Sequence, residues 1–96
     1  MHVITKRRLI EFAVRYPASR NPLLKWYQVI GRTDFASFAA LRLVFASADQ
    51  VERFTVFNIG GNKFRLIAAI HYNRRRVYVR HVLTHAEYDK DNWKER

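Results

Sequence analysis

The sequence of 96 residues has no cysteine, two prolines, three glycines and few acidic side chains. Without cysteine the chain can form neither a disulfide framework nor a thiolate metal site, which fits a cytoplasmic protein. No apolar run approaches the roughly 18 residues that a membrane span requires. The N-terminal residues also lack the apolar stretch of a secretory signal. Because no internal repeat, linker or low-complexity segment is present, residues 1–96 are predicted to form a single domain.

The scarcity of acidic residues leaves eight Asp and Glu against eighteen Lys and Arg, a net charge of +10 and an isoelectric point near 10.7. In a small domain this balance indicates a polyanionic partner, which can be nucleic acid, an acidic membrane surface or an acidic protein. The hydrophobic content of 49% is sufficient for one core. Charge therefore selects a class of partner, but it does not select an activity.

The N-terminal part is predicted to be mainly helical. After a short candidate strand at residues 2–4, a helix is expected over Thr5–Tyr16, with Thr5 as its cap and Pro17 directly after it. A second helix is expected over 21–31, because its first residues are Asn-Pro and its last is a glycine. Since the turn between the two helices is short, they should pack as an antiparallel pair.

The middle of the chain gives weaker signals. Thr33-Asp34 can cap a third, shorter helix through Phe38 and Leu41. The end of that helix is not defined, since the segment LRLVFA can equally begin an extended stretch. Ser47–Gln50 is typical of a loop.

Residues 53–83 are predicted to form three antiparallel strands. A strand over Arg53–Ile59 leads through the turn Gly60-Gly61-Asn62 into a second strand over Lys63–Tyr72. The turn Asn73-Arg74-Arg75 joins it to a third strand over about Arg76–Leu83.

Alternation of apolar residues predicts the register of the last two strands. Pairing Tyr72 with Val77 and Leu66 with Leu83 places both apolar sets on one buried face. A slip of one residue would turn arginines toward the core, at a large desolvation cost. The opposite face is then predicted to be open and to carry three cations and a histidine. Its residues are Lys63, Arg65, Ile67, Ala69, His71, Tyr78, Arg80, Val82 and Thr84.

The segment Thr84-His85-Ala86-Glu87 fits the capping box S/T-x-x-E, which predicts a helix from His85 to about Trp93. By helical spacing, His85, Tyr88 and Asp89 fall on one side of its first turn. Free backbone N–H groups at a helix start favour bound anions, so a phosphodiester could bind there.

The expected order of elements predicts an α+β fold of two layers. An N-terminal helical pair should pack on an antiparallel sheet of three to four strands, followed by a short C-terminal helix. The helices would cover the apolar face of the sheet and leave the basic face open.

Three cations of that face, Lys63, Arg65 and Arg80, can hold phosphate groups, since arginine makes bidentate contacts to them. An ordinary exposed sheet face is the alternative interpretation. His85 is suited to acid–base work near neutral pH, but a simple surface residue in a first turn has the same signature.

Other residues give weaker signals. Tyr78 and Tyr88 can stack on nucleic acid bases or merely fill space. His71, His81 and His85 do not share one helix, as the i, i+4 pair of helical zinc motifs does, so no metal site and no cofactor are predicted. In the expected register His81 faces the core.

Two segments carry a resemblance to a known family: FNIGGNKFRLI at residues 57–67 and VRHVLTHAEYD at residues 79–89. They are similar to the HigB toxins, which belong to the RelE-like superfamily of bacterial toxin–antitoxin systems. The similarity extends over nearly the whole chain and includes FASAD at residues 45–49. GGNKFR and THAEYD are its specific parts, whereas the N-terminal helices match only in pattern.

The resemblance implies the RelE-like fold and a ribosome-dependent mRNA interferase. In that superfamily the 2′-OH of the substrate attacks the adjacent phosphate, which gives a 2′,3′-cyclic phosphate and a 5′-OH end without a metal. It also implies a HigA-type antitoxin with a helix-turn-helix domain, so the chain would meet DNA only through that partner. An acidic segment of the antitoxin is expected to lie on the basic sheet face.

The resemblance also implies roles for individual residues. Arg65 and Arg80 match strand arginines that steady the phosphate, and Lys63 matches a lysine position less closely. His85 is the expected proton donor or acceptor, Tyr88 stacks or shares the proton transfer, and His71 is a reserve base. The wider RNA-binding surface is expected to comprise Lys63, Arg65, His71, Arg74, Arg75, Arg76, Tyr78 and Arg80.

A second function from another class fits the same charge pattern. The chain could be a non-catalytic, basic module that binds RNA or the ribosome. In that case arginine substitutions should weaken binding and its salt dependence, whereas a change at His85 should have no effect.

Overall fold

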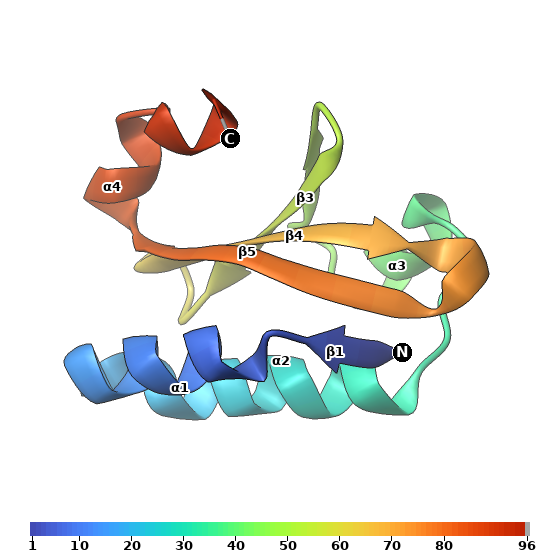
Figure 1. Ribbon diagram of the computed structural model, residues 1–96, viewed down its shortest axis with the longest axis horizontal. Coiled ribbons are helices and arrows are strands. Elements are labelled where there is room, and N and C mark those ends of the chain that lie inside the picture. Colours follow the sequence, from blue (N-terminus) through green and yellow to red (C-terminus); the bar gives the residue numbers. More distant parts are fainter. Residues whose placement is uncertain (96) are drawn as a thin grey trace.

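A mixed sheet of five strands organises the chain, and the computed structural model describes residues 1–95 of it (Figure 1). The strands are β1 (His2–Ile4), β2 (Asp49–Val51), β3 (Phe54–Ile59), β4 (Phe64–His71) and β5 (Arg76–Thr84). Their order across the sheet is β1-β5-β4-β3-β2. Neighbours are antiparallel except β1, which lies parallel to β5.

Helical elements lie on both sides of this sheet. The α-helices are α1 (Lys6–Arg15), α2 (Arg20–Arg32), α3 (Phe38–Val44) and α4 (His85–Asp89). Short 3₁₀ turns are η1 (Pro17–Ser19), η2 (Tyr72–Arg74) and η3 (Asn92–Glu95). Figure 1 shows the α1–α2 pair along one face of the sheet and α4 with the C-terminal segment on the opposite side.

The predicted α+β architecture is confirmed, with two differences in the sheet. It has five strands instead of three to four, and the contribution of β1 makes it mixed instead of purely antiparallel. β2 also forms where a loop was predicted. The candidate strand at residues 2–4 is confirmed as β1. β2 has only three residues, and a segment of that length is too short for alternation to indicate a strand.

The antiparallel helical pair is confirmed, but its caps differ from the predicted ones. Thr5 adopts φ 70° and makes no cap hydrogen bond. Its hydroxyl donates instead to the carbonyl of Val79 at 3.1 Å, which ties the start of α1 to β5. α2 begins at Arg20, so Asn21 lies inside the helix and does not cap it.

The third helix begins later than predicted. Ser37 caps α3, because its hydroxyl accepts a hydrogen bond from the N–H of Ala40 at 3.2 Å. The expected cap Asp34 has another partner: its carboxylate lies 3.1 Å from the α-amino group of Met1. This ion pair with Met1 engages the Asp34 carboxylate, so Asp34 does not cap α3.

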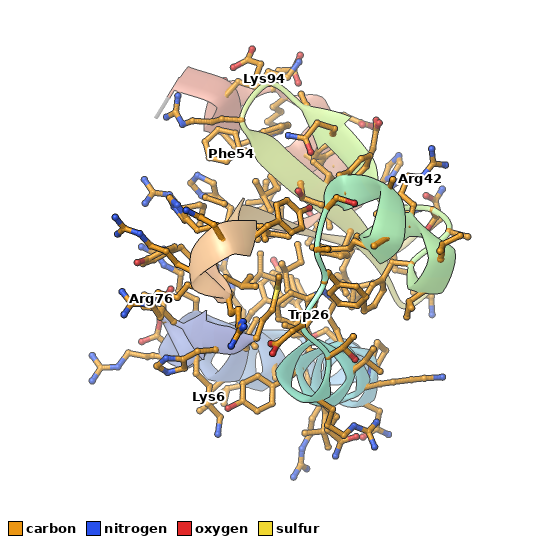
Figure 2. All side chains as sticks on the ribbon, turned by 90° about the vertical axis from the view of Figure 1, so that its right-hand side faces the viewer. Lys6, Trp26, Arg42, Phe54, Arg76 and Lys94 are labelled. Atoms are coloured by element: carbon orange, nitrogen blue, oxygen red, sulfur yellow. The ribbon has the colours of Figure 1, made fainter. Side chains whose placement is uncertain are left out.

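The main core fills the space between the helical pair and the sheet. Trp26 of α2 packs edge-on against Phe57 of β3, with ring centroids 5.4 Å apart. Figure 2 shows Trp26 between its helix and the sheet, and Phe54 on the other side, near the C-terminal segment. Fully buried members from helices and strands include Leu23, Ile30, Leu41, Leu66, Ala68, Val77 and Val79.

The second face of the sheet is not the open basic surface that was predicted. A smaller apolar cluster of Phe54, Val56, Ile67 and Trp93 covers part of it, with Leu83 and Tyr88 packed alongside. Trp93 comes from η3 and meets Phe54 edge-on at 5.9 Å. The C-terminal segment therefore closes this part of the face, and Arg65 beneath it is only 7% exposed.

The register of the β4–β5 hairpin differs from the predicted one. Ile70 pairs with Val77, and Leu66 pairs with Val82 because a bulge shifts the register between Ile67 and Ala68. One extra residue in a strand reverses which face every later side chain occupies. Val82 therefore packs with the main core and Leu83 with the smaller cluster, opposite to the prediction.

Candidate active site

Arg65 of β4 is the centre of a hydrogen-bonded cluster at the end of the sheet. Its Nη1 donates to the carbonyls of Asn62 and Phe64, at 3.2 and 3.1 Å. Its Nη2 donates to the side-chain oxygen of Asn62 and faces Nδ1 of His85 at 3.1 Å. The β-hairpin turn and the start of α4 thus hold both terminal nitrogens of a buried guanidinium.

The two neighbours of His85 determine which ring nitrogen carries its proton in the neutral ring. A guanidinium can only donate, so Nδ1 of His85 accepts from Arg65. Nε2 then carries the proton and donates it to the Asp89 carboxylate, 3.1 Å away. Arg65, His85 and Asp89 form a continuous chain from a buried cation to an exposed carboxylate, with the ring about half exposed.

The predicted capping box is confirmed and holds the His85 backbone in place. The hydroxyl of Thr84 accepts from the N–H of Glu87 at 3.2 Å, while the Glu87 carboxylate accepts from the N–H of Thr84 at 2.9 Å. The N–H of His85 donates to the carbonyl of Lys63 at 3.0 Å. Because these N–H groups are already engaged, and α4 has only five residues, its start offers little to the anion that was expected there.

Removal of the Thr84 cap should lower the stability of the fold and change the surroundings of the His85 ring. Thr84→Ala is expected to lower the free energy of unfolding by about 1 kcal/mol, measured by urea denaturation. Ser37→Ala is the matched control, because it removes the cap of α3, far from Arg65 in the fold. Both variants should lose similar stability, but only Thr84→Ala should alter the chemical shifts of the His85 ring. Equal shifts in the two variants would contradict the proposed role of this cap.

Tyr88 lies beside the chain of Arg65, His85 and Asp89. Its ring stacks on Trp93 with centroids 5.4 Å apart and an interplanar angle of 16°, and the Arg65 guanidinium lies 5.5 Å from the ring centre. These contacts engage the ring within the protein, so it is poorly placed to stack on a base. Burial, followed by the charge of Asp49, raises the pKa of the Tyr88 phenol above its usual value of 10.0. The hydroxyl therefore keeps its proton at neutral pH.

The other predicted site residues have side chains outside this cluster. Lys63 is exposed beside it and contributes its carbonyl, whereas Arg80 is exposed at the bulge of β5. His71 ends β4 and lies six residue steps from Arg65, a distance of about 20 Å. His71 packs edge-on against Tyr78 at 5.2 Å. With it at the far end of the hairpin lie the exposed cations Arg74, Arg75 and Arg76.

His81 does not occupy the core position that was expected. It is partly buried and lines a hollow with residues of α1, among them Arg8 and Arg15. The bulge accounts for this difference, since it ends the regular alternation of β5 just before His81.

Three residues of the cluster were missing from the predicted site. Asn62 was interpreted only as a turn residue, yet its side chain binds Arg65. Asp89 was placed beside His85 by helical spacing, but without a role. Trp93 gave no signal, because its contact with Tyr88 depends on how the chain folds back after α4. The i, i+4 relation of His85 and Asp89 was the one signal that could have indicated a pair.

Two further observations concern metal binding and membrane insertion. Among residues 1–95, no group of three His, Asp or Glu side chains is placed to hold a metal ion. In the same part of the chain, every helix is too short or too polar to cross a membrane.

Comparison with known proteins gives a consistent family. Residues 19–91 match the model of HigB_toxin, described as the RelE-like toxic component of a toxin–antitoxin system. The mRNA interferase HigB of Escherichia coli O6:H1 is 38% identical over 93 residues, covering 94% of this chain and 90% of that protein. The mRNA interferase toxin HigB of Escherichia coli K12 is 35% identical over 92 residues, covering 93% and 88%. The chain therefore belongs to the HigB toxin family, the RelE-like toxic components of toxin–antitoxin systems.

Proposed function

We propose that this toxin is an endoribonuclease that cleaves mRNA on the ribosome and thereby inhibits translation. Curated relatives of similar length are named mRNA interferases, which supports RNA cleavage as the activity. The observation that carries the proposal is the hydrogen-bonded chain of Arg65, His85 and Asp89. It combines a cation, a proton-transfer group and a carboxylate within a few ångströms, which is what cleavage of a phosphodiester requires.

The proposed reaction uses the ribose 2′-OH of the substrate as nucleophile. Its oxygen bonds to the adjacent phosphorus while its proton passes to Nδ1 of His85. The bond from phosphorus to the 5′-oxygen of the next nucleotide then breaks, and that oxygen takes up a proton. The products are a 2′,3′-cyclic phosphate and a 5′-OH end. These steps need only proton transfer and charge stabilisation, so the proposed enzyme requires no metal.

In this proposal Arg65 connects substrate binding to activation of the base. In the free protein its Nη2 donates a hydrogen bond to the Nδ1 lone pair of His85. When the scissile phosphate binds, the same Nη2 moves its hydrogen bond to a phosphate oxygen and leaves the Nδ1 lone pair free. Arg65 then stabilises the charge on the transition state, where a preorganised donor has its largest effect.

Asp89 has a separate, positioning role. It accepts from Nε2 of His85 at 3.1 Å and so keeps the proton on that nitrogen. As His85 takes up a second proton, the nearby carboxylate stabilises the imidazolium that forms, by the same logic as the carboxylate of a serine-protease triad.

The Tyr88 hydroxyl is the proposed donor of the proton that the leaving 5′-oxygen takes up. Tyr88→Phe keeps the stack on Trp93 and removes only the hydroxyl, so the cleavage rate should fall about tenfold to a hundredfold, the value of one hydrogen bond to a charged group. The readout is single-turnover cleavage of ribosome-bound mRNA. Tyr78→Phe, at the far end of the hairpin, can change only RNA binding, so it should leave that rate unchanged at saturating toxin. An unaltered rate for Tyr88→Phe would leave the ring with a packing role only.

The basic surface beyond the cluster is proposed to bind RNA. Lys63 lies beside the cluster and Arg80 lies farther along β5, at the bulge. Both would contact phosphates of the substrate on either side of the scissile bond. The far end of the hairpin carries the remaining groups of this surface, which would contact a separate stretch of RNA: His71, Arg74, Arg75, Arg76 and Tyr78. Since the distance of about 20 Å between these ends exceeds one nucleotide step, an extended substrate or the ribosome fits better than a short RNA.

As the toxic component of a toxin–antitoxin system, the chain has an antitoxin partner. We propose that this partner is of the HigA type, with a helix-turn-helix domain through which the complex contacts DNA. Cleavage of translated mRNA also requires that the toxin acts in the cytoplasm.

The proposal is tested with purified toxin, ribosomes and a defined mRNA. Discrete new ends within the reading frame are expected only when ribosomes are present. Their 5′ termini should accept phosphate from a polynucleotide kinase directly, and their 3′ termini should carry a cyclic phosphate. Cleavage of free mRNA at equal rates would remove the ribosome from the proposal. Arrest of translation with intact mRNA would instead indicate the non-catalytic binding module.

A further inference from the structure

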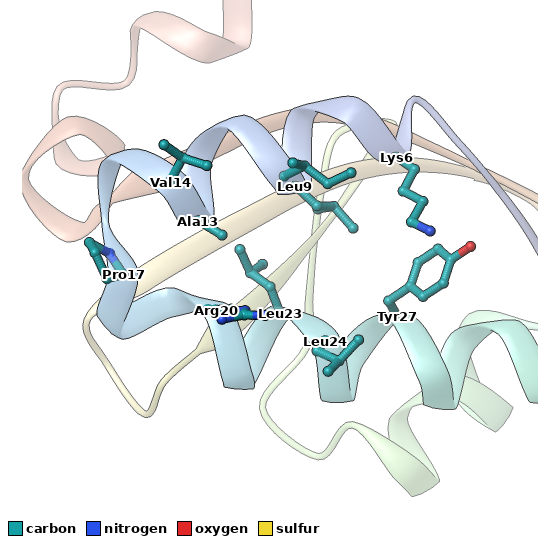
Figure 3. Close-up of a pocket in the computed structure, with 10 residues that line it drawn as sticks. Lys6, Leu9, Ala13, Val14, Pro17, Arg20, Leu23, Leu24 and Tyr27 are labelled. Atoms are coloured by element: carbon teal, nitrogen blue, oxygen red, sulfur yellow. The ribbon is translucent and has the colours of Figure 1, made fainter.

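The outer surface of the α1–α2 pair contains an apolar groove that lies away from the Arg65–His85 cluster. It has a volume of about 530 Å³, and Figure 3 shows side chains of both helices along it. Its floor includes the buried Leu9 and Leu23, whereas Val14 is 76% and Leu24 is 50% exposed. Ile10 is also more than half exposed. A small protein seldom leaves so many apolar side chains together in water unless another molecule covers them.

The groove and the cluster lie on opposite sides of the sheet. Leu9 and Leu23 belong to the core between helices and sheet, whereas Tyr88 packs in the smaller cluster on the other face. Figure 1 shows the same separation between the α1–α2 pair and α4. A molecule bound in the groove therefore leaves the cluster uncovered.

The shape of the groove fits a third helix. It runs between two antiparallel helices from Lys6 and Tyr27 at one end to Pro17 and Arg20 at the other. Eleven helical residues span about 16 Å, which is the length of three helical turns. An amphipathic helix can place apolar side chains at i, i+3 or i+4, and i+7 along such a groove.

The charge around the groove selects an acidic helix. Residues 6–32 contain seven lysines and arginines but a single acidic residue, Glu11. Lys6 and Arg20 lie at opposite ends of the groove itself. A second copy of this chain carries a net charge of +10 and would be repelled. A partner with acidic side chains flanking an apolar stripe is complementary in both respects.

We infer that the antitoxin places an acidic amphipathic helix of about three turns in the α1–α2 groove. The inference rests on the toxin–antitoxin part of the proposed function and is independent of the RNA chemistry. It differs from the expected cover of the basic sheet face, because the anchor lies behind the sheet. Neutralisation would then require either a second antitoxin segment or exclusion of the bound complex from the ribosome.

The absence of cysteine allows a direct test with single thiols. Val14→Cys places one thiol in the groove, and Leu43→Cys places a matched thiol on α3, where Leu43 is 87% exposed. Each full-length variant is treated with a maleimide, alone and with the cognate antitoxin, and modification of the toxin chain is followed by mass spectrometry. At an antitoxin concentration ten times its Kd, modification of Val14→Cys should slow by about tenfold, and that of Leu43→Cys should not change.

Every other outcome overturns the inference. Equal rates at Val14→Cys with and without antitoxin would show that the groove stays empty in the complex. Protection that appears in the toxin alone and rises with its concentration would identify a second copy as the occupant. Protection by anionic vesicles but not by the antitoxin would identify a membrane surface.

A second variant tests the energetics of the groove. Val14→Asp with Leu24→Asp adds two carboxylates at exposed positions, so the fold should be retained, as circular dichroism can verify. Antitoxin affinity should fall by about tenfold to a hundredfold, while mRNA cleavage by the free toxin stays unchanged. Leu43→Asp is the control and should leave the affinity as it is. Loss of cleavage with unchanged antitoxin affinity would instead link the groove to the RNA reaction, which the inference does not allow.

Discussion

Replacing His85 by alanine is expected to lower the rate of mRNA cleavage by about 10²–10⁴-fold, the usual contribution of a general acid or base. The physical reason is that Nδ1 of His85 accepts the proton of the 2′-OH in the proposed reaction, and that Arg65 and Asp89 hold its ring. The fold should be retained, because the His85 ring is about half exposed and its contact with Asp89 is a surface pair. Such pairs contribute at most about 1 kcal/mol.

The measurement is mapping of mRNA 5′ ends after induction, together with single-turnover rates on programmed ribosomes. His71→Ala is the matched control, since His71 lies about 20 Å along β4 from Arg65. It should retain the cleavage rate, and it would change only the affinity for RNA. Persistent cleavage in His85→Ala would move the proton transfer to Asp89 or Tyr88. If the unaltered toxin arrested growth without producing any new mRNA 5′ end, a non-catalytic RNA- or ribosome-binding module would be favoured.

The second large effect is expected for Arg65→Lys. Lysine keeps the charge but cannot reproduce four directed hydrogen bonds from two planar nitrogens. The variant should lose about 1–3 kcal/mol of unfolding free energy, because buried acceptors lose their donor. The cleavage rate at saturating RNA should fall by about 10²–10³-fold, as when one preorganised donor to a developing charge is removed.

Arg80→Lys separates this role from simple attraction of RNA. Arg80 is exposed at the bulge of β5, so its replacement should raise KM modestly and leave both kcat and stability unchanged. Urea denaturation and steady-state kinetics measure the two variants side by side. If Arg65→Lys raised only KM, as Arg80→Lys is expected to do, Arg65 would be a binding residue without a role in positioning His85.

Much of the fold could be predicted from local patterns. The amphipathic stripe of α1, the proline after it and the turn Gly60-Gly61-Asn62 each act within a few residues, and the corresponding elements form where they were expected. The capping box at Thr84 is also local, and it positions His85 as predicted.

Features that depend on long-range contacts were not predicted. The bulge in β5 leaves no mark in composition, yet it exchanges Val82 and Leu83 between the faces of the sheet. Trp93 covers the second face because the chain folds back after α4, which alternation cannot reveal. As a result, Arg65 was expected in the open, although the structure buries it beneath Tyr88 and Trp93.

The site residues divide in the same way. His85 and Arg65 were identified by residue type and by their motifs, and they meet at 3.1 Å. His71 and the arginines of residues 74–76 share the same strands, but strand length separates them from that cluster. Residue type indicated the cations and histidines of the hairpin, whereas distance along β4 determines which of them lie close enough together to contact one phosphate.

The order of synthesis gives the arrangement of β4, β5 and α4 a further meaning. Arg65 meets His85 only after β5 and α4 have been made, since His85 follows the whole hairpin in the chain. All residues that line the α1–α2 groove have been translated by Tyr27. At about 5–20 residues per second, the ribosome needs roughly 3–12 seconds to extend the chain from Tyr27 to Asp89. In a nascent toxin the residues of the groove are thus available to a partner several seconds before the proposed catalytic cluster of Arg65, His85 and Asp89 can form.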